Sequence, residues 1–518
     1  MEVLLVLIGL MLLTVIVVAV GDKLGLPWPA LLSILAALSM FIPRLPDFTI
    51  PTDLILPVFL PPLLWALARR TSWGVIREQW MTILSLSVLL VVATTMAVGM
   101  TAYAFLPGIS LAGAILIGAA IAPPDPVAVE AVAEPAGIPR RIISTLQTEG
   151  LFNDAASIVA FHLALVAVTD GSNMSWADAI TSFLYSAVVA AILGWGSGRL
   201  ASIFIARVHE VVARNALTWV IPFAVYVVAE ELHASGVIAV VIAAVELHSR
   251  APIQAEDRLS GQSFWETIEL LFTGVAFGLI GMTVNTAVHE AGANLGHSVI
   301  VGILLSLVAF VVRLLWMWVF YLINKKRGKP RLAPLRLQEV LLMTWSGMRG
   351  LVTLALVLSI PSDAIAYSDE LSVIALTVLV MTMVIPGLLL PWLMKQLDLT
   401  TYSQAASDKM RTEITSRARR AGIQSLRKKY QELDPEIAAN ISQWFEERLG
   451  EDEDGDDAST RMQKAIQARD VAIAARRVAL AGAQQELLRL RRDRNFNPMI
   501  VDEVLEEVDR MTLGTKTH

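Results

Sequence analysis

The chain has 518 residues, of which 55% are hydrophobic and 17% charged, and its formal net charge is −6. A soluble protein carries about a quarter charged residues, so this composition indicates a membrane protein. The chain shows no basic domain or nucleic-acid-reading motif, so nucleic acid is not expected as a partner. Because it has no cysteine, disulfides, thiolate metal sites and cysteine nucleophiles are excluded.

Apolar runs of about 20 residues, each able to cross a hydrocarbon core of about 30 Å, recur from the first residue to about position 396. They predict an all-α polytopic fold with about thirteen transmembrane helices. The first run resembles a signal peptide but carries Glu2 where a basic n-region would lie, so we expect a retained span. The expected limits are 2–20, 28–43, 51–68, 81–106, 111–133, 143–168, 176–198, 216–232, 235–249, 264–284, 297–323, 337–360 and 371–395.

An odd number of spans puts the two termini on opposite sides of the membrane, and basic residues in short loops mark the cytoplasmic side. With the N-terminus outside, the expected outer loops contain Arg44 as their one basic residue, and the remaining loop basic residues are cytoplasmic. These are Lys23, Arg69, Arg70, Arg77, Arg140, Arg141, Arg199, Arg207, Arg214, Arg250, Arg258 and six more in "NKKRGKPRLAPLR". We therefore predict an inner-membrane protein with an outside N-terminus and a cytoplasmic C-terminus.

Beyond the last span the composition changes from apolar to mixed charge. Two segments with helical propensity are separated by the acidic run "EDEDGDD", which lacks the ligand spacing of a calcium loop and is interpreted as a solvated linker. We expect a transmembrane domain over 1–396 and a helical, regulatory cytoplasmic region over 397–518.

Four ionisable residues are expected near mid-membrane, where each costs about 2.5–3.5 kcal/mol on insertion scales. They are Asp125 in the fifth span, Glu149 and Asp154 in the sixth, and Arg349 in the twelfth. Asp154 lies about 12 residues into its span, or about 18 Å at 1.5 Å per residue. Charges at matched depth in three spans indicate a functional site.

The backbone around two of these charges cannot be a continuous helix. Three prolines surround Asp125 in "APPDPVAV", and Gly347 and Gly350 flank Arg349 in "WSGMRGLVT". Broken helices at membrane depth are tolerated where they line a cavity, and a broken span in each half of a chain is typical of transporters built from inverted repeats. The alternative is a pair of ordinary kinks around one buried salt bridge.

The charges suggest a mechanism. Arg349 stays protonated and needs one carboxylate partner. Glu149 and Asp154 are five residues apart, about 140° around a helix, so one group is not expected to pair tightly with both. One carboxylate can then be a structural counter-ion, while the other is neutralised by either a proton or a dehydrated cation. This predicts proton–cation exchange.

The motifs "DPVAV" (125–129), "EGLFND" (149–154) and "GMRG" (347–350), supported by "FLPPLL" (59–64) and "GLIGM" (278–282), resemble the sodium/proton exchanger family, in particular the electroneutral, NhaP-like bacterial antiporters. The order and spacing match along residues 1–396. The resemblance implies a secondary antiporter, not an enzyme, that contributes to pH homeostasis. It also implies a homodimer in lipid, two broken crossing helices, and no cofactor besides the transported Na⁺ or other monovalent cation and H⁺.

The resemblance also implies roles for residues. Asp154 would bind the cation and the proton, and Asn153 stands where electrogenic relatives carry a second aspartate, which implies one proton per cation. Glu149 would pair with Arg349, and Asp125 would offset the positive helix ends of the broken fifth span. The expected cation- and proton-binding set is Asp154, Asn153, Asp125, Pro124 and Ser157. In this set Pro124 would offer a backbone carbonyl, and Ser157 either a ligand hydroxyl or a bond to its own backbone.

Several alternatives stay open. Relatives carry an acidic residue two positions after "LPPLL", where this chain has Ala66, so a potassium/proton exchanger is the main rival to a sodium exchanger. A cation channel would be expected to show a filter, a membrane sensor would need an effector domain, and the Asn-Asp pair argues against solute symport. His162 is either a packing residue or a proton relay. Glu130 and Glu134 either attract cations or are ordinary interfacial carboxylates, and Glu269 and Arg313 are a possible buried pair.

Overall fold

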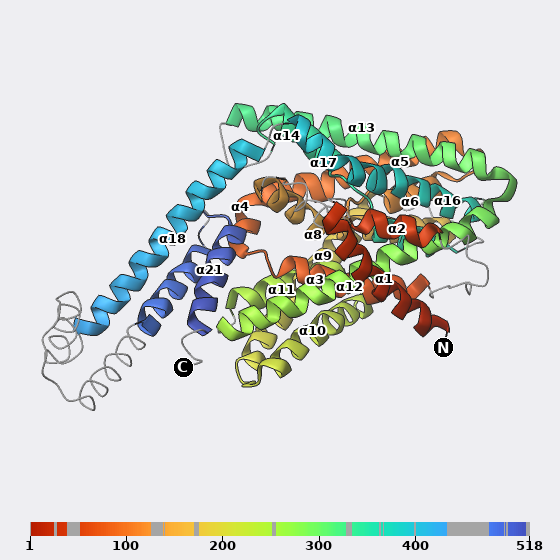
Figure 1. The fold of residues 1–518 in the computed structure, drawn as a ribbon. Coiled ribbons are helices and arrows are strands. Elements are labelled where there is room, and N and C mark those ends of the chain that lie inside the picture. The colour runs from red at the N-terminus through yellow and green to blue at the C-terminus, as the bar shows by residue number, and fades with distance from the viewer. Residues whose placement is uncertain are drawn as a thin grey trace, which may run out of the picture. The chain divides into compact units, whose positions relative to one another are not determined.

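A computed structural model of the chain describes residues 2–24, 28–38, 52–125, 138, 140–169, 176–250, 255–327, 334–361, 364–365, 367–397, 400–431, 476–491, 493 and 496–513. All secondary-structure elements assigned within these residues are helices, which confirms the all-α prediction (Figure 1). Contacts divide the chain into two units. One comprises Met1–Ala251 with Ser263–Gln404, and the other comprises Pro252–Gln262 with Ala405–His518.

The first helices of this unit overlap the spans expected from hydropathy, but α4 begins at Trp73 rather than near 81 and α9 ends at Ile205 rather than near 198. The expected fourth span consists of the end of one α-helix, a π-helical segment and a second α-helix. The bounds are α1 Glu2–Leu24, α2 Trp28–Leu38, α3 Thr52–Ala68, α4 Trp73–Ile83, η2 Leu84–Leu89, α5 Leu90–Phe105, α6 Leu111–Ile121, α8 Arg140–Thr169, α9 Trp176–Ile205, α10 Val211–Glu231 and α11 Gly236–Arg250.

The remaining helices include two that are much longer than expected. α12 begins at Ala255 rather than near 264, so Arg258 lies in a helix and not in a loop. The bounds are α12 Ala255–Ala291, η3 Gly292–Asn294, α13 Leu295–Arg327, α14 Leu337–Trp345, α15 Leu351–Leu358, α16 Ser368–Leu379, η4 Val380–Val384 and α17 Ile385–Leu397.

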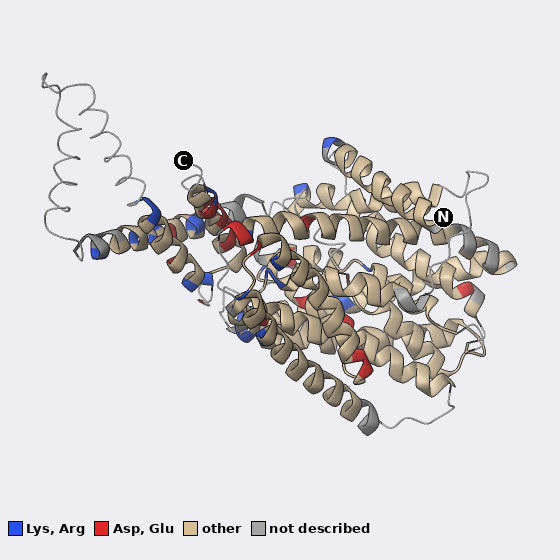
Figure 2. Ribbon diagram, turned by 90° about the horizontal axis from the view of Figure 1, so that it is seen from below, with Lys and Arg blue, Asp and Glu red and all other residues tan. Residues whose placement is uncertain are grey.

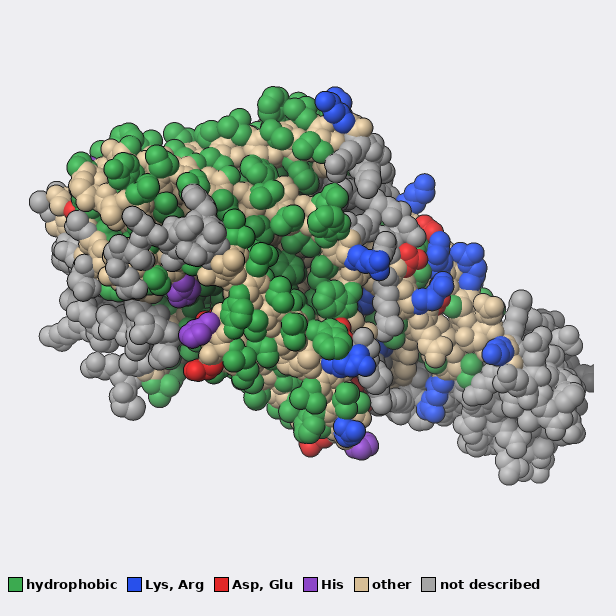
Figure 3. Space-filling view, turned by 180° about the vertical axis from the view of Figure 1, so that it is seen from behind, with side chains coloured by type: hydrophobic (Ala, Val, Ile, Leu, Met, Phe, Trp, Pro, Cys, Tyr) green, Lys and Arg blue, Asp and Glu red, His purple; other side chains and the backbone are tan. Residues whose placement is uncertain are grey.

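Eight helical stretches in the described residues are long and apolar enough to cross a membrane, and shorter apolar helices accompany them. Figure 2 shows these helices as long stretches without charge, with basic and acidic residues mostly toward their ends. Hydrophobic side chains cover a large part of the surface drawn in Figure 3. On α9, Leu184, Val188 and Ile192 are each more than half exposed. Such an apolar exterior suits contact with lipid.

Packing in the first unit brings the helices with the predicted site residues together. α6 packs against α5 and α8, α13 packs against α5 and α16, and α15 contacts α6 and α3. Small residues allow these approaches, because Ala114, Ala119 and Ala120 on α6 are fully buried. α6 and α8, which carry the fifth- and sixth-span motifs, therefore lie side by side.

The second unit contains α18 (Thr400–Gln431) from Ala405 onward, a helix over 476–491, and α21 (Pro498–Leu513), together with the first residues of α12. Leu487, Leu490, Val501 and Leu505 form its apolar core with Ile414. The acidic run "EDEDGDD" lies outside the described residues. This unit is helical where it is described.

Within the second unit the start of α12 is tied to α21 by ionic contacts. Arg258 Nε and an Nη group donate to the two oxygens of Asp509, each over 2.5 Å, and Asp509 is 1% exposed. Gln484 Nε2 also donates to Asp509, over 2.7 Å. Asp509 on α21 therefore connects this helix to the start of α12 and to the helix over 476–491.

Candidate functional site

Both predicted interruptions of helix are present. α6 ends at Ile121, and residues 122–125 are not helical, while the continuation over 126–137 lies outside the described residues. In the second half, α14 ends at Trp345, and α15 begins only at Leu351. The broken backbone is what the prolines around Asp125 and the glycines around Arg349 predict.

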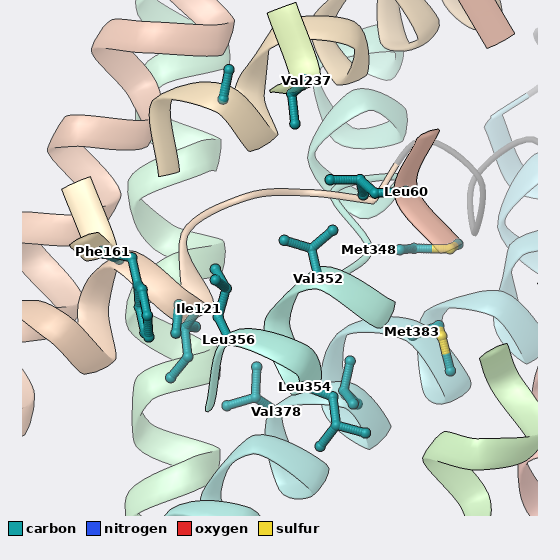
Figure 4. Close-up of a cluster of buried hydrophobic side chains, with 14 of the residues drawn as sticks. Leu60, Ile121, Phe161, Val237, Met348, Val352, Leu354, Leu356, Val378 and Met383 are labelled. Atoms are coloured by element: carbon teal, nitrogen blue, oxygen red, sulfur yellow. The ribbon is translucent and has the colours of Figure 1, made fainter. Parts of the chain in front are cut away.

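The two broken segments are bonded to each other although they lie in opposite halves of the chain. The Asp125 backbone N–H donates to the carbonyl of Met348 over 2.6 Å, and Asp125 Oδ2 accepts from the Leu351 N–H over 3.1 Å. Figure 4 shows Ile121, at the end of α6, in one cluster with Met348 and Val352. The breaks therefore meet and form one site.

Asp125 lies at the start of α15, because Leu351 is the first residue of that helix. A carboxylate is stabilised there by free N–H groups and by the positive end of the helix dipole. The sequence led us to expect Asp125 at a positive helix end of its own span. That helix end would lie in the continuation of the fifth span, which is outside the described residues. Within the described residues Asp125 caps the helix of the other broken span, α15.

Arg349 mirrors this arrangement at a negative helix end. Its Nε donates to the carbonyl of Ile121, the last residue of α6, over 3.2 Å, and Nη1 donates to the Gly347 carbonyl over 2.5 Å. Its side chain is 3% exposed. A guanidinium is favourable at the C-terminal end of a helix, where carbonyls lack intrahelical partners.

The predicted direct pair of Glu149 with Arg349 is wrong. The Glu149 oxygens instead accept two bonds from Arg313 on α13, over 2.5 Å and 2.9 Å, and both side chains are at most 3% exposed. The fork of a guanidinium matches both carboxylate oxygens, whereas the donors of Arg349 are directed at backbone carbonyls. Arg313 is the partner of Glu149 that the sequence did not reveal. The available signal was a single charge in the middle of a 33-residue apolar helix.

Two glycines make room for these charges. A Cβ on Gly350 would lie 1.6 Å from Asp125 Oδ2, and one on Gly347 would lie 2.4 Å from Arg313 Cδ and Nε. The glycines of "GMRG" therefore do more than interrupt the helix. They let Asp125 and Arg313 approach the broken backbone of the twelfth span.

Asn153 and Ser157 bind α8 to the fifth span. The Asn153 amide nitrogen donates to the Pro124 carbonyl over 2.5 Å, and its oxygen accepts from the Asp154 N–H over 2.6 Å. Ser157 Oγ donates to the Ala119 carbonyl over 2.7 Å, so it does not bond its own backbone. These side chains hold the broken segment of the fifth span against α8.

Asp154 is 3% exposed, and its Oδ1 has no hydrogen-bond partner among the described groups. Together with Asp125 it lines a cavity that is otherwise mostly apolar. The remaining lining residues are Leu60, Leu63, Leu64, Leu67, Thr273, Ala276, Phe277, Leu351 and Val352. In Figure 4, Leu60 and Val352 lie close together at this place. Of the five predicted binding residues, the cavity brings together Asp154 and Asp125.

α3 supplies four leucines to this cavity, and Ala66 is not among its lining residues. Ala66 and Trp65 are fully buried elsewhere, and the Trp65 ring lies edge-on to His248 at 6.1 Å between centroids. The described lining therefore receives no carboxylate from α3.

Those weaker candidates that fall within the described residues do not line the cavity. His162 is exposed, so the packing interpretation of this residue is wrong for the chain as described. Glu269 pairs with Arg70 over 3.0 Å, which contradicts its proposed pairing with Arg313. Glu130 and Glu134 lie outside the described residues.

A comparison with known families matches residues 7–396 to the transmembrane sodium/hydrogen exchanger family. A sodium, potassium, lithium and rubidium/H⁺ antiporter of Bacillus pumilus is 31% identical over 74% of this chain and 60% of its own length. A low-affinity Na⁺/H⁺ antiporter of Synechocystis is 31% identical over 67% of this chain and 65% of its own length. The solved sodium proton antiporter MjNhaP1 of Methanocaldococcus jannaschii is 20% identical, with a TM-score of 0.58, over 77% of this chain and 99% of its own.

The apolar helices, the two broken segments that meet, and the buried carboxylate beside them define a secondary transporter rather than an enzyme. The chain belongs to the sodium/hydrogen exchanger family. It is a multi-pass membrane protein of the cation/proton antiporter class.

Proposed function

We propose that the protein exchanges one monovalent cation, preferentially Na⁺, for one H⁺ by alternating access, without net movement of charge. The observation that carries this proposal is the burial and hydrogen bonding of the Asp154 carboxylate. Its carboxylate is buried in a cavity and has an oxygen without a partner among the described groups, whereas Glu149 is fully engaged by Arg313. A buried carboxylate of this kind must be neutralised by a ligand.

Charge balance around the two breaks supports a stoichiometry of one to one. Among the described residues near the breaks, three buried carboxylates (Asp125, Glu149 and Asp154) accompany two buried guanidinium groups (Arg313 and Arg349). With every group ionised, one negative charge is left over. One proton or one monovalent cation at Asp154 cancels it, so both loaded forms of the site are neutral.

The neutral forms can change access, because an uncompensated charge at membrane depth is costly. Asp154 takes up a cation from one side, the core rearranges, and a proton replaces the cation on the other side. Asn153 adds no charge to this count, and its amide holds the Pro124 carbonyl in place. The empty site carries an uncompensated charge and cannot change access, so cation transport and proton transport are coupled.

A broader cation selectivity, including K⁺, is the second candidate. The described lining contains no carboxylate from α3, so the charge of the site comes from Asp154 and Asp125. The Bacillus pumilus relative is named for four alkali cations. Selectivity between oxygen-bound cations depends on cavity size, ligand number and flexibility, and a lining with few oxygen ligands favours broad selectivity.

The membrane topology, the oligomeric state and the role of the C-terminal region are proposed from the pattern of loop charges and from the family. Basic residues of the expected loops favour an inner-membrane protein with an outside N-terminus, a cytoplasmic C-terminus and thirteen spans in inverted repeats. A homodimer and a regulatory tail over 397–518 complete the proposal. Cysteine-accessibility labelling of the naturally cysteine-free chain would test the orientation, with single cysteines at Arg44 and Arg207.

Purified protein in liposomes provides the main test. The internal pH is followed with an entrapped dye while Na⁺, K⁺ or Li⁺ is added outside. We expect cation-driven alkalinisation of the lumen when the lumen is acidic, with Na⁺ giving the lowest KM. Exchange that persists in Asp154→Asn, or a pH change that no alkali cation drives, would overturn the proposal.

A further inference from the structure

The hydroxyl of Thr273, on α12, is buried without a partner. The side chain is 2% exposed, and its Oγ1 makes no hydrogen bond with the described groups. Threonines in helices usually return this bond to their own backbone. On the same helix Thr267 bonds the Ser263 carbonyl over 2.9 Å, and Thr283 bonds the Ile280 carbonyl over 2.8 Å. Thr273 differs from both in leaving its hydroxyl unused.

Thr273 lines the same cavity as Asp154, whose Oδ1 is also without a partner among the described groups. Thr95, Ser346 and Thr353 also have buried, unpartnered hydroxyl oxygens, but they are not among the lining residues. Thr273 therefore combines two properties that do not occur together in those three residues. Its hydroxyl is unsatisfied, and it belongs to the cavity of the ion-binding carboxylate.

The other residues that α12 and α3 contribute to the lining are apolar. They are Ala276 and Phe277 from α12 and Leu60, Leu63, Leu64 and Leu67 from α3. A dehydrated alkali cation needs several oxygen ligands, whereas a proton needs one oxygen. A neutral hydroxyl supplies a further oxygen and leaves the charge balance of the site unchanged.

We propose that Thr273 is a ligand of the cation bound at Asp154 and that it sets the affinity for cations relative to protons. This inference rests on the proposed exchange function. The hydroxyl comes from a different helix than either aspartate, so a cation held by both sides links α12 to α8. It also provides a side-chain oxygen in a lining to which α3 contributes leucines only.

The test compares Thr273→Val, which removes the hydroxyl at similar volume, with Thr273→Ser, which keeps it. Thr95→Val is the matched control, because Thr95 is 4% exposed with an equally unpartnered hydroxyl but does not line the cavity. Exchange is measured in liposomes as a function of Na⁺, K⁺ and Li⁺ concentration. Cation-dependent protection against thermal unfolding in detergent gives a second readout that needs no turnover.

We expect Thr273→Val to raise the KM for Na⁺ about tenfold while the rate at saturating Na⁺ is largely kept, and we expect the cation-dependent thermal protection to shrink in parallel. Thr273→Ser and Thr95→Val should behave like the unaltered protein. If Thr273→Val does not fold, Thr273→Ala serves in its place. Unchanged KM values and thermal protection in these variants would overturn the assignment of Thr273, whereas exchange in Asp154→Asn would overturn the underlying function.

Discussion

Asp125 and Arg349 each occupy the helix end that the other's broken span provides. Asp125 Oδ2 accepts from the first N–H of α15, two residues beyond Arg349, and Arg349 Nε donates to the last carbonyl of α6, four residues before Asp125. The negative side chain lies at a positive helix end and the positive side chain at a negative one. Opposite charges on crossed breaks thus stabilise both interruptions through bonds to backbone groups at the helix ends.

The first prediction is that Asp154→Asn reduces exchange to the rate of protein-free liposomes while the protein still inserts and purifies normally. The amide keeps the size of the carboxylate but cannot be neutralised by a cation or a proton. Dye-reported pH change after an Na⁺ pulse is the measurement. A rate near that of the unaltered protein would remove Asp154 from the mechanism.

The second prediction concerns the ion pair of Glu149 with Arg313. Replacing either residue by glutamine leaves an uncompensated buried charge and should reduce the free energy of unfolding by about 3–5 kcal/mol. The double variant should recover part of this loss. Thermal unfolding in detergent measures both effects, and Arg207→Gln is the control because Arg207 is exposed.

A double-mutant cycle then separates the two possible partners of Glu149. We expect a larger coupling free energy for Glu149 with Arg313 than for Glu149 with Arg349, because the bonds of 2.5 Å and 2.9 Å go to Arg313. The reverse order would show that Arg349 is the energetically important partner.

The third prediction is that Gly350→Ala disturbs the crossing of the two breaks. The new Cβ would lie 1.6 Å from Asp125 Oδ2, so the carboxylate must leave the N-terminus of α15. We expect a loss of about 1–3 kcal/mol in stability, as for overpacked cores, together with much slower exchange. Gly196→Ala on α9 is the matched control, since its Cβ would meet no atom within 4 Å. Equal effects of the two substitutions would argue against this crossing.

The fourth prediction is that the end-point of exchange does not depend on membrane potential. A net charge crossing the membrane would gain or lose about 2.3 kcal/mol per 100 mV, which would be readily seen. Liposomes with and without a valinomycin-set potential are compared with Na⁺ as the driving cation, and Asp154→Asn liposomes correct for leaks. A shifted end-point would mean that a second group, such as Asp125, also exchanges a proton.

The fifth prediction is that Arg258→Gln loosens α21 from the start of α12. Asp509 is 1% exposed, and losing the two bonds from Arg258 should cost about 3 kcal/mol locally. Amide hydrogen exchange over 498–513 is expected to become faster. Arg510→Gln is the control, because Arg510 is exposed and bonds only its helical neighbour Glu506 among the contacts found for it. Unchanged exchange in Arg258→Gln would show that other contacts hold α21.

Much of this protein can be predicted from the local chemistry of its sequence. Apolar runs predict helices in lipid because backbone groups must be satisfied within each segment, and the prolines around Asp125 and glycines around Arg349 predict the two breaks for the same reason. Charges in an apolar run also predicted that one of Glu149 and Asp154 exchanges a proton for a cation, and the resemblance to the exchanger family implied that it is Asp154. Such inferences depend on neighbours along the chain.

The partners of the buried charges could not be predicted in this way, because they are set by contacts between helices far apart in sequence. Glu149 and Arg313 are 164 residues apart, and no local pattern distinguishes Arg313 from Arg349 as the partner. The crossing of the breaks likewise depends on packing, because it places Asp125 at the start of α15 and Arg349 at the end of α6. In the sequence, Thr273 does not differ from other threonines in helices. Its role could be proposed only from the structure, where it lines the cavity and its hydroxyl has no partner among the described groups. Burial and hydrogen bonding are properties of the folded chain.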